Sequence, residues 1–169
     1  MAAGPAFSGT LKFQLLRKMQ IINLKEVPHH LETLANWHHA QWSYLNPDRT
    51  LAERIDRMRE HLTPDFIPTT FIAEKNKLLG SAGIIKYDMD TRKELSPWLE
   101  GVYVSPEFRR RGIGSELVLH VMEQAVDNNV KTLYLYTTDR ETFYARLGWS
   151  TLEKTDYHGY PVTIMSVNL

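Results

Sequence analysis

The chain has no cysteine, and its formal net charge at pH 7 is zero because 20 basic residues balance 20 acidic ones. Without thiols there is no disulfide framework, no cysteine-ligated metal and no thiol nucleophile. This absence is compatible with a reducing cytoplasm, the location we predict. A neutral overall charge gives no reason to expect nucleic acid or an anionic membrane as a partner. No apolar run approaches the roughly 20 residues needed to cross a bilayer.

The length and composition of the chain are typical of a single globular domain. The chain has 169 residues, of which 43% are hydrophobic and 24% are charged, and this length allows a substantial core. Residues 1–18 hold an apolar stretch that ends in Arg17-Lys18, whereas a secretory signal has its basic residues before the apolar run. We therefore predict that residues 1–18 are an extension outside the fold, with a membrane-surface or partner helix as the alternative. Residues 19–169 then form the domain.

Hydrophobic periodicity predicts an α/β domain. Thr50 and Glu53 have the spacing of a capping box, Asp139 is placed to cap a short helix, and Gly148 suits the position after its end. Helices are expected over residues 28–42, from 50 to the prolines at 64 and 68, 113–128 and 139–147, and strands over residues 20–24, 69–74, 79–86, 98–104, 133–137, 150–157 and 162–168. This order predicts one twisted, mixed, mostly antiparallel sheet flanked by helices.

The most informative stretch is residues 102–115, which read Val-Tyr-Val-Ser-Pro-Glu-Phe-Arg-Arg-Arg-Gly-Ile-Gly-Ser. An apolar strand runs through a basic loop with glycines into a helix N-terminus, where free backbone N–H groups and the helix dipole favour an anion. Glycine lets the backbone approach a phosphate closely. The spacing Arg109-x-x-Gly112-x-Gly114 fits neither the dinucleotide fingerprint nor the P-loop. The alternatives are a solvated basic turn or a nucleic-acid patch.

This loop resembles the acetyl-CoA pyrophosphate loop of the GNAT family of N-acetyltransferases, whose pattern is Gln/Arg-x-x-Gly-x-Gly/Ala. A second stretch, Phe143-Tyr144-x-x-Leu147-Gly148-Trp149, is similar to the family's "FY-x-x-LG-aromatic" signature. The resemblance covers about residues 19–169. It implies the acyl-CoA N-acyltransferase fold, in which the strands at 98–104 and 133–137 splay apart and the pantetheine arm lies between them.

The resemblance also implies a cofactor site for acetyl-CoA as co-substrate, without a metal. The diphosphate would lie on the N–H groups of residues 110–115. Val102 and Val104 would offer main-chain bonds to the pantetheine, and a main-chain N–H near Val102 would be the oxyanion donor. The cofactor-binding residues so implied are Val102, Tyr103, Val104, Arg109, Arg110, Arg111, Gly112, Ile113, Gly114, Ser115 and Tyr144.

Two residues are the catalytic candidates. Tyr144 matches the family tyrosine that reaches the cofactor sulfur and would be the general acid; the alternative is core packing with Phe143. We expect Phe143 and Leu147, at i and i+4, to supply the buried stripe and Tyr144 to point elsewhere.

Glu100 is the candidate base, because a carboxylate in an apolar strand is costly unless it is used or paired. Strand alternation predicts that Glu100 shares a face with Trp98, Val102 and Val104. The alternative is an exposed glutamate paired with an arginine or lysine.

The two histidine pairs, His29-His30 and His38-His39, do not predict a metal site. Adjacent helical side chains point about 100° apart, and no cysteine or carboxylate cluster accompanies either pair in the sequence.

The leading interpretation is an acetyl-CoA-dependent N-acetyltransferase that acts on a primary amine of a small molecule or peptide. Residues 98–106 resemble the equivalent strand of aminoglycoside 6′-N-acetyltransferases. In contrast, Gln41-Trp42 and residues 137–139, together with the motif at 143–148, resemble protein N-terminal acetyltransferases. The acceptor therefore stays open, as does a homodimer. A non-catalytic CoA-binding regulatory module is the other alternative.

Overall fold

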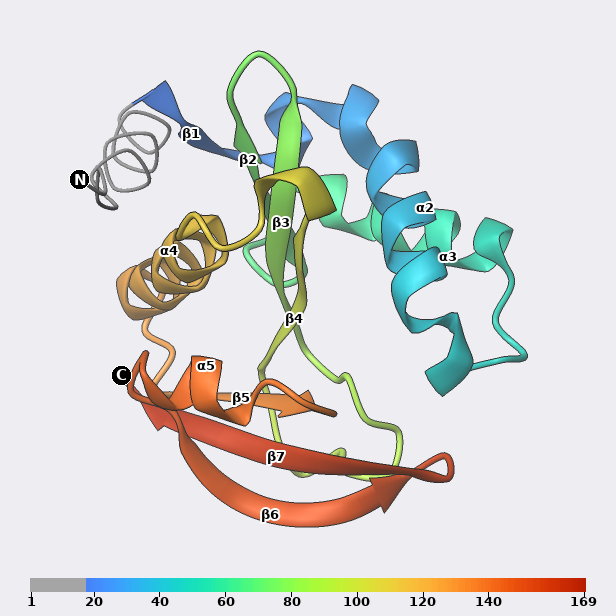
Figure 1. Ribbon diagram of the computed structural model, residues 1–169, viewed down its shortest axis with the longest axis vertical. Helices are drawn as coiled ribbons and strands as arrows, with labels where there is room; N and C mark the ends of the chain where they lie inside the picture. The colour runs from blue at the N-terminus through green and yellow to red at the C-terminus, as the bar shows by residue number, and fades with distance from the viewer. Residues whose placement is uncertain (1–17) are drawn as a thin grey trace, which may run out of the picture.

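The computed structural model describes residues 18–169 (Figure 1). The predicted extension, residues 1–18, lies outside the described residues apart from Lys18. Among the described residues, no helix combines the length and the apolar character that a membrane crossing would require.

The elements occur in the predicted order, with short 3-10 turns between them. The strands are β1 (Gln20–Asn23), β2 (Thr69–Glu74), β3 (Leu78–Ile85), β4 (Trp98–Val104), β5 (Thr132–Thr137), β6 (Ser150–Tyr157) and β7 (Tyr160–Asn168). The helices are α2 (Leu31–Trp42), α3 (Leu51–Arg59), α4 (Ile113–Asp127) and α5 (Glu141–Ala145). The 3-10 turns are η1 (Leu24–Glu26), η2 (Pro28–His30), η3 (Ser43–Leu45), η4 (Glu60–Leu62) and η5 (Pro106–Phe108).

The seven strands of residues 18–169 belong to one sheet, in the order β1-β2-β3-β4-β5-β7-β6. Every neighbouring pair is antiparallel except β4 and β5. These two parallel strands pair only at Trp98 and Tyr134, and beyond that point they run apart, as Figure 1 shows. The predicted mixed, mostly antiparallel sheet and its splayed central strands are therefore confirmed.

Helices cover both faces of the sheet. On one face Leu117 and Val121 of α4 pack in a core cluster with Phe71 of β2. On the other face Leu34 of α2 packs in a second cluster with Ile72, because successive strand residues point to opposite faces. Figure 1 shows α4 on one side of β3 and β4, and α2 and α3 on the other. The sheet therefore separates two layers, and a gap in it connects them.

Local capping signals are confirmed at two of the three predicted places. Thr50 and Glu53 form a capping box at the start of α3. Gly148, at φ +95°, ends the segment after α5, and the Trp149 N–H donates to the Tyr144 carbonyl at 3.2 Å. The third prediction is wrong, because Asp139 does not cap α5. The Thr137 hydroxyl oxygen, at the end of β5, accepts the Arg140 N–H at 2.9 Å instead.

A bulge in β4 changes which side chains face α4. Ser81 pairs with Tyr103 and Gly83 with Glu100, so β4 has one more residue than β3 between these pairs. Gly101 takes up the extra residue at φ +60°. The alternation is broken there, and the prediction that Glu100 shares a face with Val102 and Val104 is wrong.

The packing of β4 agrees with this change of face. Val102 and Val104 pack on the α4 side, whereas the Tyr103 ring packs 5.3 Å from the Trp37 ring of α2. The Glu100 carboxylate lies beside Gly83, 2.8 Å from where a Cβ on that glycine would be. The bulge thus turns Glu100 toward the layer formed by α2 and α3.

Candidate active site

One cleft of about 940 Å³ contains nearly every predicted site residue. It starts at the N-terminus of α4, follows β4 along the gap in the sheet, and reaches α3 on the opposite face. Glu100 and Tyr144 line it, as do all the predicted cofactor-binding residues except Arg111. Such a volume is typical of a small-molecule or cofactor site.

The N-terminus of α4 presents backbone N–H groups without a side-chain cap. The helix follows Gly112, which has φ +86° in the left-handed region, and its first i to i−4 bond is donated by the Glu116 N–H. The N–H groups of Ile113, Gly114 and Ser115 are therefore left for another acceptor. With the positive end of the helix dipole, they form an anion site.

Gly114 has room for a side chain within the protein itself. A Cβ on Gly114 would lie 3.5 Å from the Phe143 ring and 3.6 Å from the Val104 side chain, which are ordinary van der Waals contacts. The packing of the protein therefore does not require glycine at this position. The bare backbone leaves space at the cleft wall for a ligand to approach.

The main chain at the end of β4 also faces the gap. The Ser105 N–H donates to the Leu79 carbonyl at 2.8 Å, so by antiparallel alternation the Val104 N–H and carbonyl point away from β3 and toward β5. Arg109 donates its Nε–H to the Val104 carbonyl at 2.8 Å. The Val104 N–H therefore points into the gap, where it can donate to a ligand.

The arginines of the loop have different surroundings. The Arg109 guanidinium lies 5.4 Å from the Tyr103 ring centre, and Arg110 lines the cleft with φ +61°. Arg111 lies over the Phe108 ring at 5.4 Å and is outside the cleft. The structure thus brings two of the three predicted arginines to the cleft. In each aromatic contact the ring holds the guanidinium beside it by cation–π attraction.

Tyr144 is both a core residue and a cleft residue. Its ring is 8% exposed and packs edge-to-face on Phe143 and Trp149. Burial raises the pKa of the Tyr144 hydroxyl above its ordinary value, although Arg140 works in the opposite direction. Phe143 and Leu147 are only half-buried, so the prediction that they alone form the buried stripe is wrong. The reason is that α5 lies at the edge of the gap, where Phe143 borders the cleft.

Glu100 lies in the cleft on the α2 and α3 side of the sheet. Within residues 18–169, no lysine, arginine or histidine nitrogen lies within 4.0 Å of its carboxylate. The alternative of a strand-end glutamate in an ion pair is therefore not what the structure shows. Among the described residues, Glu100 therefore lines the cleft without a cationic side chain in contact with its carboxylate.

Sequence reasoning missed the role of His38 beneath β4. His38 is 1% exposed, its Nε2 lies 2.8 Å from the Ser81 hydroxyl, and that hydroxyl donates to the Gly101 carbonyl at 2.8 Å. Ser81 therefore accepts the Nε2–H of His38. Burial lowers the pKa of His38 to about 3, which keeps the imidazole neutral. This chain of hydrogen bonds holds the bulge that turns Glu100. The sequence contains no signal that distinguishes His38 from the other histidines.

A charged group of residues at the α3 end of the cleft was also missed. It consists of Arg49, Arg54, Arg57 and Asp88. Burial, with help from Glu100, raises the pKa of the Asp88 carboxyl to about 7. Burial lowers the pKa of Arg49 and of Arg54. The one signal in the sequence was the helical i, i+3 spacing of Arg54 and Arg57.

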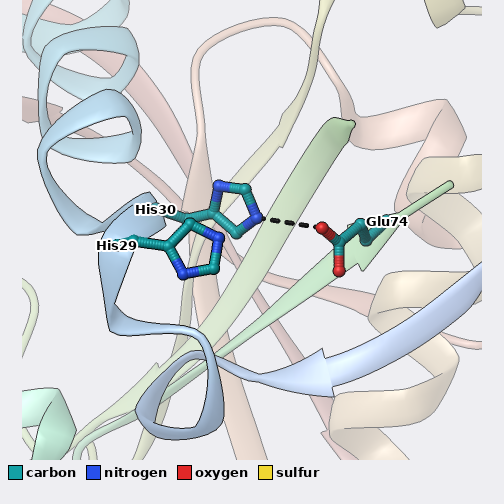
Figure 2. A group of neighbouring side chains, drawn as sticks. All are labelled: His29, His30 and Glu74. Atoms are coloured by element: carbon teal, nitrogen blue, oxygen red, sulfur yellow. Dashed lines mark hydrogen bonds and ion pairs between the residues drawn. The ribbon is translucent and has the colours of Figure 1, made fainter. Parts of the chain in front are cut away.

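His29 and His30 do have a carboxylate neighbour (Figure 2). The ligand atoms of His29, His30 and Glu74 all lie within 4.8 Å of one another, and His30 Nε2 is 3.2 Å from Glu74 Oε1. The argument that no carboxylate accompanies this pair is therefore wrong, because the sheet brings in the end of β2. None of the three residues lines the cleft, so this group is separate from the site.

Comparison with known proteins assigns the fold and site to a class. The model of the Acetyltransferase (GNAT) family matches residues 31–149. The chain belongs to this family, and the predicted family and acyl-CoA N-acyltransferase fold are confirmed.

Individual relatives agree with this assignment. Thialysine N-epsilon-acetyltransferase from Bos taurus is 37% identical over 57 residues, which span 34% of each chain. An aminoglycoside 6′-N-acetyltransferase complexed with coenzyme A has a TM-score of 0.70 at 17% identity and is covered over 96% of its length by 88% of this chain. An acetyltransferase from Salmonella typhimurium with its cofactor acetyl-CoA has a TM-score of 0.66 at 16% identity, over 89% of this chain and 94% of that one.

Proposed function

We propose that this chain transfers an acetyl group from acetyl-CoA to a primary amine. The observation that carries the proposal is the uncapped N-terminus of α4 at the mouth of a gap between β4 and β5. An anion site at one end of a cleft that crosses the sheet suits a long, phosphate-bearing thioester. At the other end, the unpaired Glu100 carboxylate suits the approach of an amine.

The residues present fit acetyl-CoA. The N–H groups of Ile113, Gly114 and Ser115 would hold the diphosphate, and the main chain at Val102 and Val104 would hold the pantetheine. Bound acetyl-CoA supplies the acetyl group as a thioester. The two structural neighbours described with CoA or acetyl-CoA support this choice of cofactor.

Three groups of the chain would promote the transfer. A main-chain N–H near Val102 donates a hydrogen bond to the oxygen that becomes negative at the reacting carbonyl. Glu100, directly or through water, takes a proton from the attacking amine as general base. Tyr144 would donate a hydrogen bond from its hydroxyl to the departing sulfur. Because burial raises the pKa of Tyr144, full transfer of its proton is uphill, and the hydroxyl acts mainly as a hydrogen-bond donor in the transition state.

The proposal is tested by release of free CoA from acetyl-CoA in the presence of a panel of primary amines. Thermal unfolding with acetyl-CoA, CoA and duplex DNA accompanies it. Acetyl-CoA at about 100 times its Kd should stabilise the fold by about 2.7 kcal/mol, and DNA should not. Stabilisation by DNA, or none by acetyl-CoA, contradicts the proposal. The aromatic contacts of Arg109 and Arg111 argue against a nucleic-acid surface.

A non-catalytic CoA-binding module is the second candidate. The observation that favours it is the core packing of Tyr144, which would retain the residue without any chemistry. Binding of acetyl-CoA without amine-dependent release of CoA would select this candidate. Release that depends on an amine would exclude it.

A further inference from the structure

The acceptor end of the cleft gathers guanidinium groups from one short segment. Arg54 and Arg57 lie one turn apart on α3, so they share a helix face. Arg49 comes just before the capping residue of that helix. All three line the cleft together with Glu100.

These arginines lack the ion pairs that others in the protein have. Within residues 18–169, no carboxylate oxygen lies within 4.0 Å of Arg49, Arg54 or Arg57. In contrast, Arg59 on the same helix pairs with Asp56. Arg54 Nε is also buried without a hydrogen-bond partner. A buried, unpartnered guanidinium nitrogen is costly, which indicates a place for an anion.

The pKa shifts show that these charges act on one another. After burial, the next largest cause that lowers the pKa of Arg49 is Arg57, and for Arg54 it is Arg49. Repulsion among three cations relaxes when an anion binds between them. Arginine also binds planar carboxylates through paired N–H donors.

Two carboxylates lie at the same end of the cleft. Asp88 and Glu100 line it, and each of the three arginines lowers the pKa of Asp88, against the larger effect of burial. The carboxylates attract an ammonium group and the arginines attract an anion. With three cations and two carboxylates, the end is not suited to an acceptor that carries only positive charges.

We propose that the acceptor is an amino acid, which presents its amine to Glu100 and Asp88 and its carboxylate to Arg49, Arg54 and Arg57. This inference rests on the proposed acetyl transfer and names the class of its acceptor. It argues against the aminoglycoside acceptor left open above, because a polycationic aminoglycoside has no anion to place on the arginines.

The test is calorimetric binding to the protein saturated with CoA, at about pH 8 so that Asp88 is ionised. The probes are L-lysine and 6-aminohexanoate, with cadaverine and n-hexylamine as their carboxylate-free counterparts. O-phosphoethanolamine and an acidic tripeptide amide are also titrated, to test whether a phosphate or a peptide is preferred to an amino acid. Each amino acid should bind at least about 10-fold more tightly than its counterpart, as expected for a charge-assisted pair.

Variants then assign the preference to the arginines. Arg57→Gln, at an exposed position that should not affect folding, and Arg54→Gln should each reduce the preference to within about 3-fold and leave CoA affinity unchanged. Arg59→Gln is the matched control, because it removes a guanidinium on the same helix that is outside the cleft. It should keep the full preference.

Several results would overturn the inference. The first is that the amino acids bind no more tightly than their carboxylate-free counterparts, or do not bind at all. The second is that O-phosphoethanolamine or the tripeptide amide binds more tightly than the amino acids. The third is that Arg59→Gln loses the preference for amino acids. A failure of acetyl transfer is distinguishable from these results. A protein that binds amino acids selectively but releases no CoA contradicts the proposed acetyl transfer, while it confirms that this end of the cleft selects amino acids. Aminoglycoside-dependent release of CoA without amino-acid binding supports acetyl transfer and contradicts the amino-acid acceptor.

Discussion

The two ends of the cleft are built by different means. At the cofactor end, consecutive residues from Arg109 to Ser115 present backbone N–H groups of one helix start. At the acceptor end, side chains come from α3, from the loop after β3 and from β4. Backbone donors hold any diphosphate in the same way, whereas side-chain charges select among amines. In the function that we propose, the cofactor end therefore defines the reaction and the acceptor end defines the substrate.

The bulge at Gly101 connects the two ends. If Gly101 continued the regular alternation of the strand instead of forming a bulge, Glu100 would share the face of Val102 and Val104 and face α4. The bulge turns it to the acceptor face while the rest of β4 keeps its place beside the cofactor end. One strand can thus serve both sides of the sheet.

The largest effect is expected at Tyr144, which stands between the ends. Tyr144→Phe keeps the ring and removes the hydroxyl, so kcat should fall about 10²–10⁴-fold while the KM for acetyl-CoA changes little. Steady-state kinetics with an accepted amine measure both constants. Tyr134→Phe, at a residue outside the cleft, is the control and should keep kcat. If Tyr144→Phe keeps the wild-type kcat when departure of the sulfur limits the rate, the hydroxyl has no catalytic role and Tyr144 acts only in packing.

At the cofactor end, Gly114→Ala should have opposite effects on stability and binding. The fold has space for the methyl group, and alanine favours helix, so the melting temperature should not fall. A methyl group at the diphosphate should weaken acetyl-CoA binding by about 10-fold, or about 1.4 kcal/mol. Calorimetry and thermal unfolding measure the two effects. The control is Leu119→Ala, on the exposed side of α4, which should leave the affinity for acetyl-CoA unchanged. Unaltered affinity in Gly114→Ala would show that the start of α4 does not bind the diphosphate.

Beneath the acceptor end, His38 should make the fold sensitive to acid. Its pKa of about 3 in the folded protein lies below the unfolded value, so the unfolded chain binds the extra proton. Stability is then complete above about pH 6.5 and falls as the pH decreases toward 3. At about pH 4.5 the loss should be about 2 to 3 kcal/mol.

The measurement for His38 is the pH dependence of the free energy of unfolding in wild type and in His38→Gln. Asp88 acts in the opposite direction, because its raised pKa favours the folded state as the pH falls from about 7. The difference between the two proteins isolates His38. It should shrink as the pH falls below about 6.5; a constant difference would show that the imidazole is not buried in its neutral form.

The smallest effect is expected away from both ends, at His29, His30 and Glu74. Because none of these residues lines the cleft, removal of metal with a chelator should leave acetyl transfer unchanged. His29→Ala should also keep wild-type kcat. Loss of activity with the chelator, restored by Zn²⁺ in wild type but not in His29→Ala, would contradict this separation.

The same contrast explains what the sequence could predict. The cofactor end depends on local rules, since a strand, glycines and a helix start within fourteen consecutive residues specify it. The order of strands and helices follows from periodicity in the same way. The face of the sheet on which Glu100 lies could not be predicted from periodicity, because Gly101 in the left-handed conformation breaks the alternation. The motif around Tyr144 predicted that this residue lies at the cofactor site, but it did not show that the ring is also part of the core.

The acceptor end depends on contacts between distant segments. Arg54 and Arg57 look like ordinary surface charges of an amphipathic helix, and Asp88 like a loop residue. Only the packing of α3 against the sheet brings them to Glu100. Likewise, Glu74 reaches His30 only because η2 lies beside the end of β2. A single sequence contains no signal for such pairings.

A crystal structure of the protein with CoA tests the account most directly. We predict diphosphate oxygens within about 3 Å of the N–H groups of Ile113, Gly114 and Ser115, and the pantetheine in the gap between β4 and β5, with its sulfur near Tyr144. The arginines at positions 49, 54 and 57 should stay free of the cofactor. CoA bound outside this gap, or its phosphates on those arginines, would contradict the division of the cleft into a cofactor end and an acceptor end.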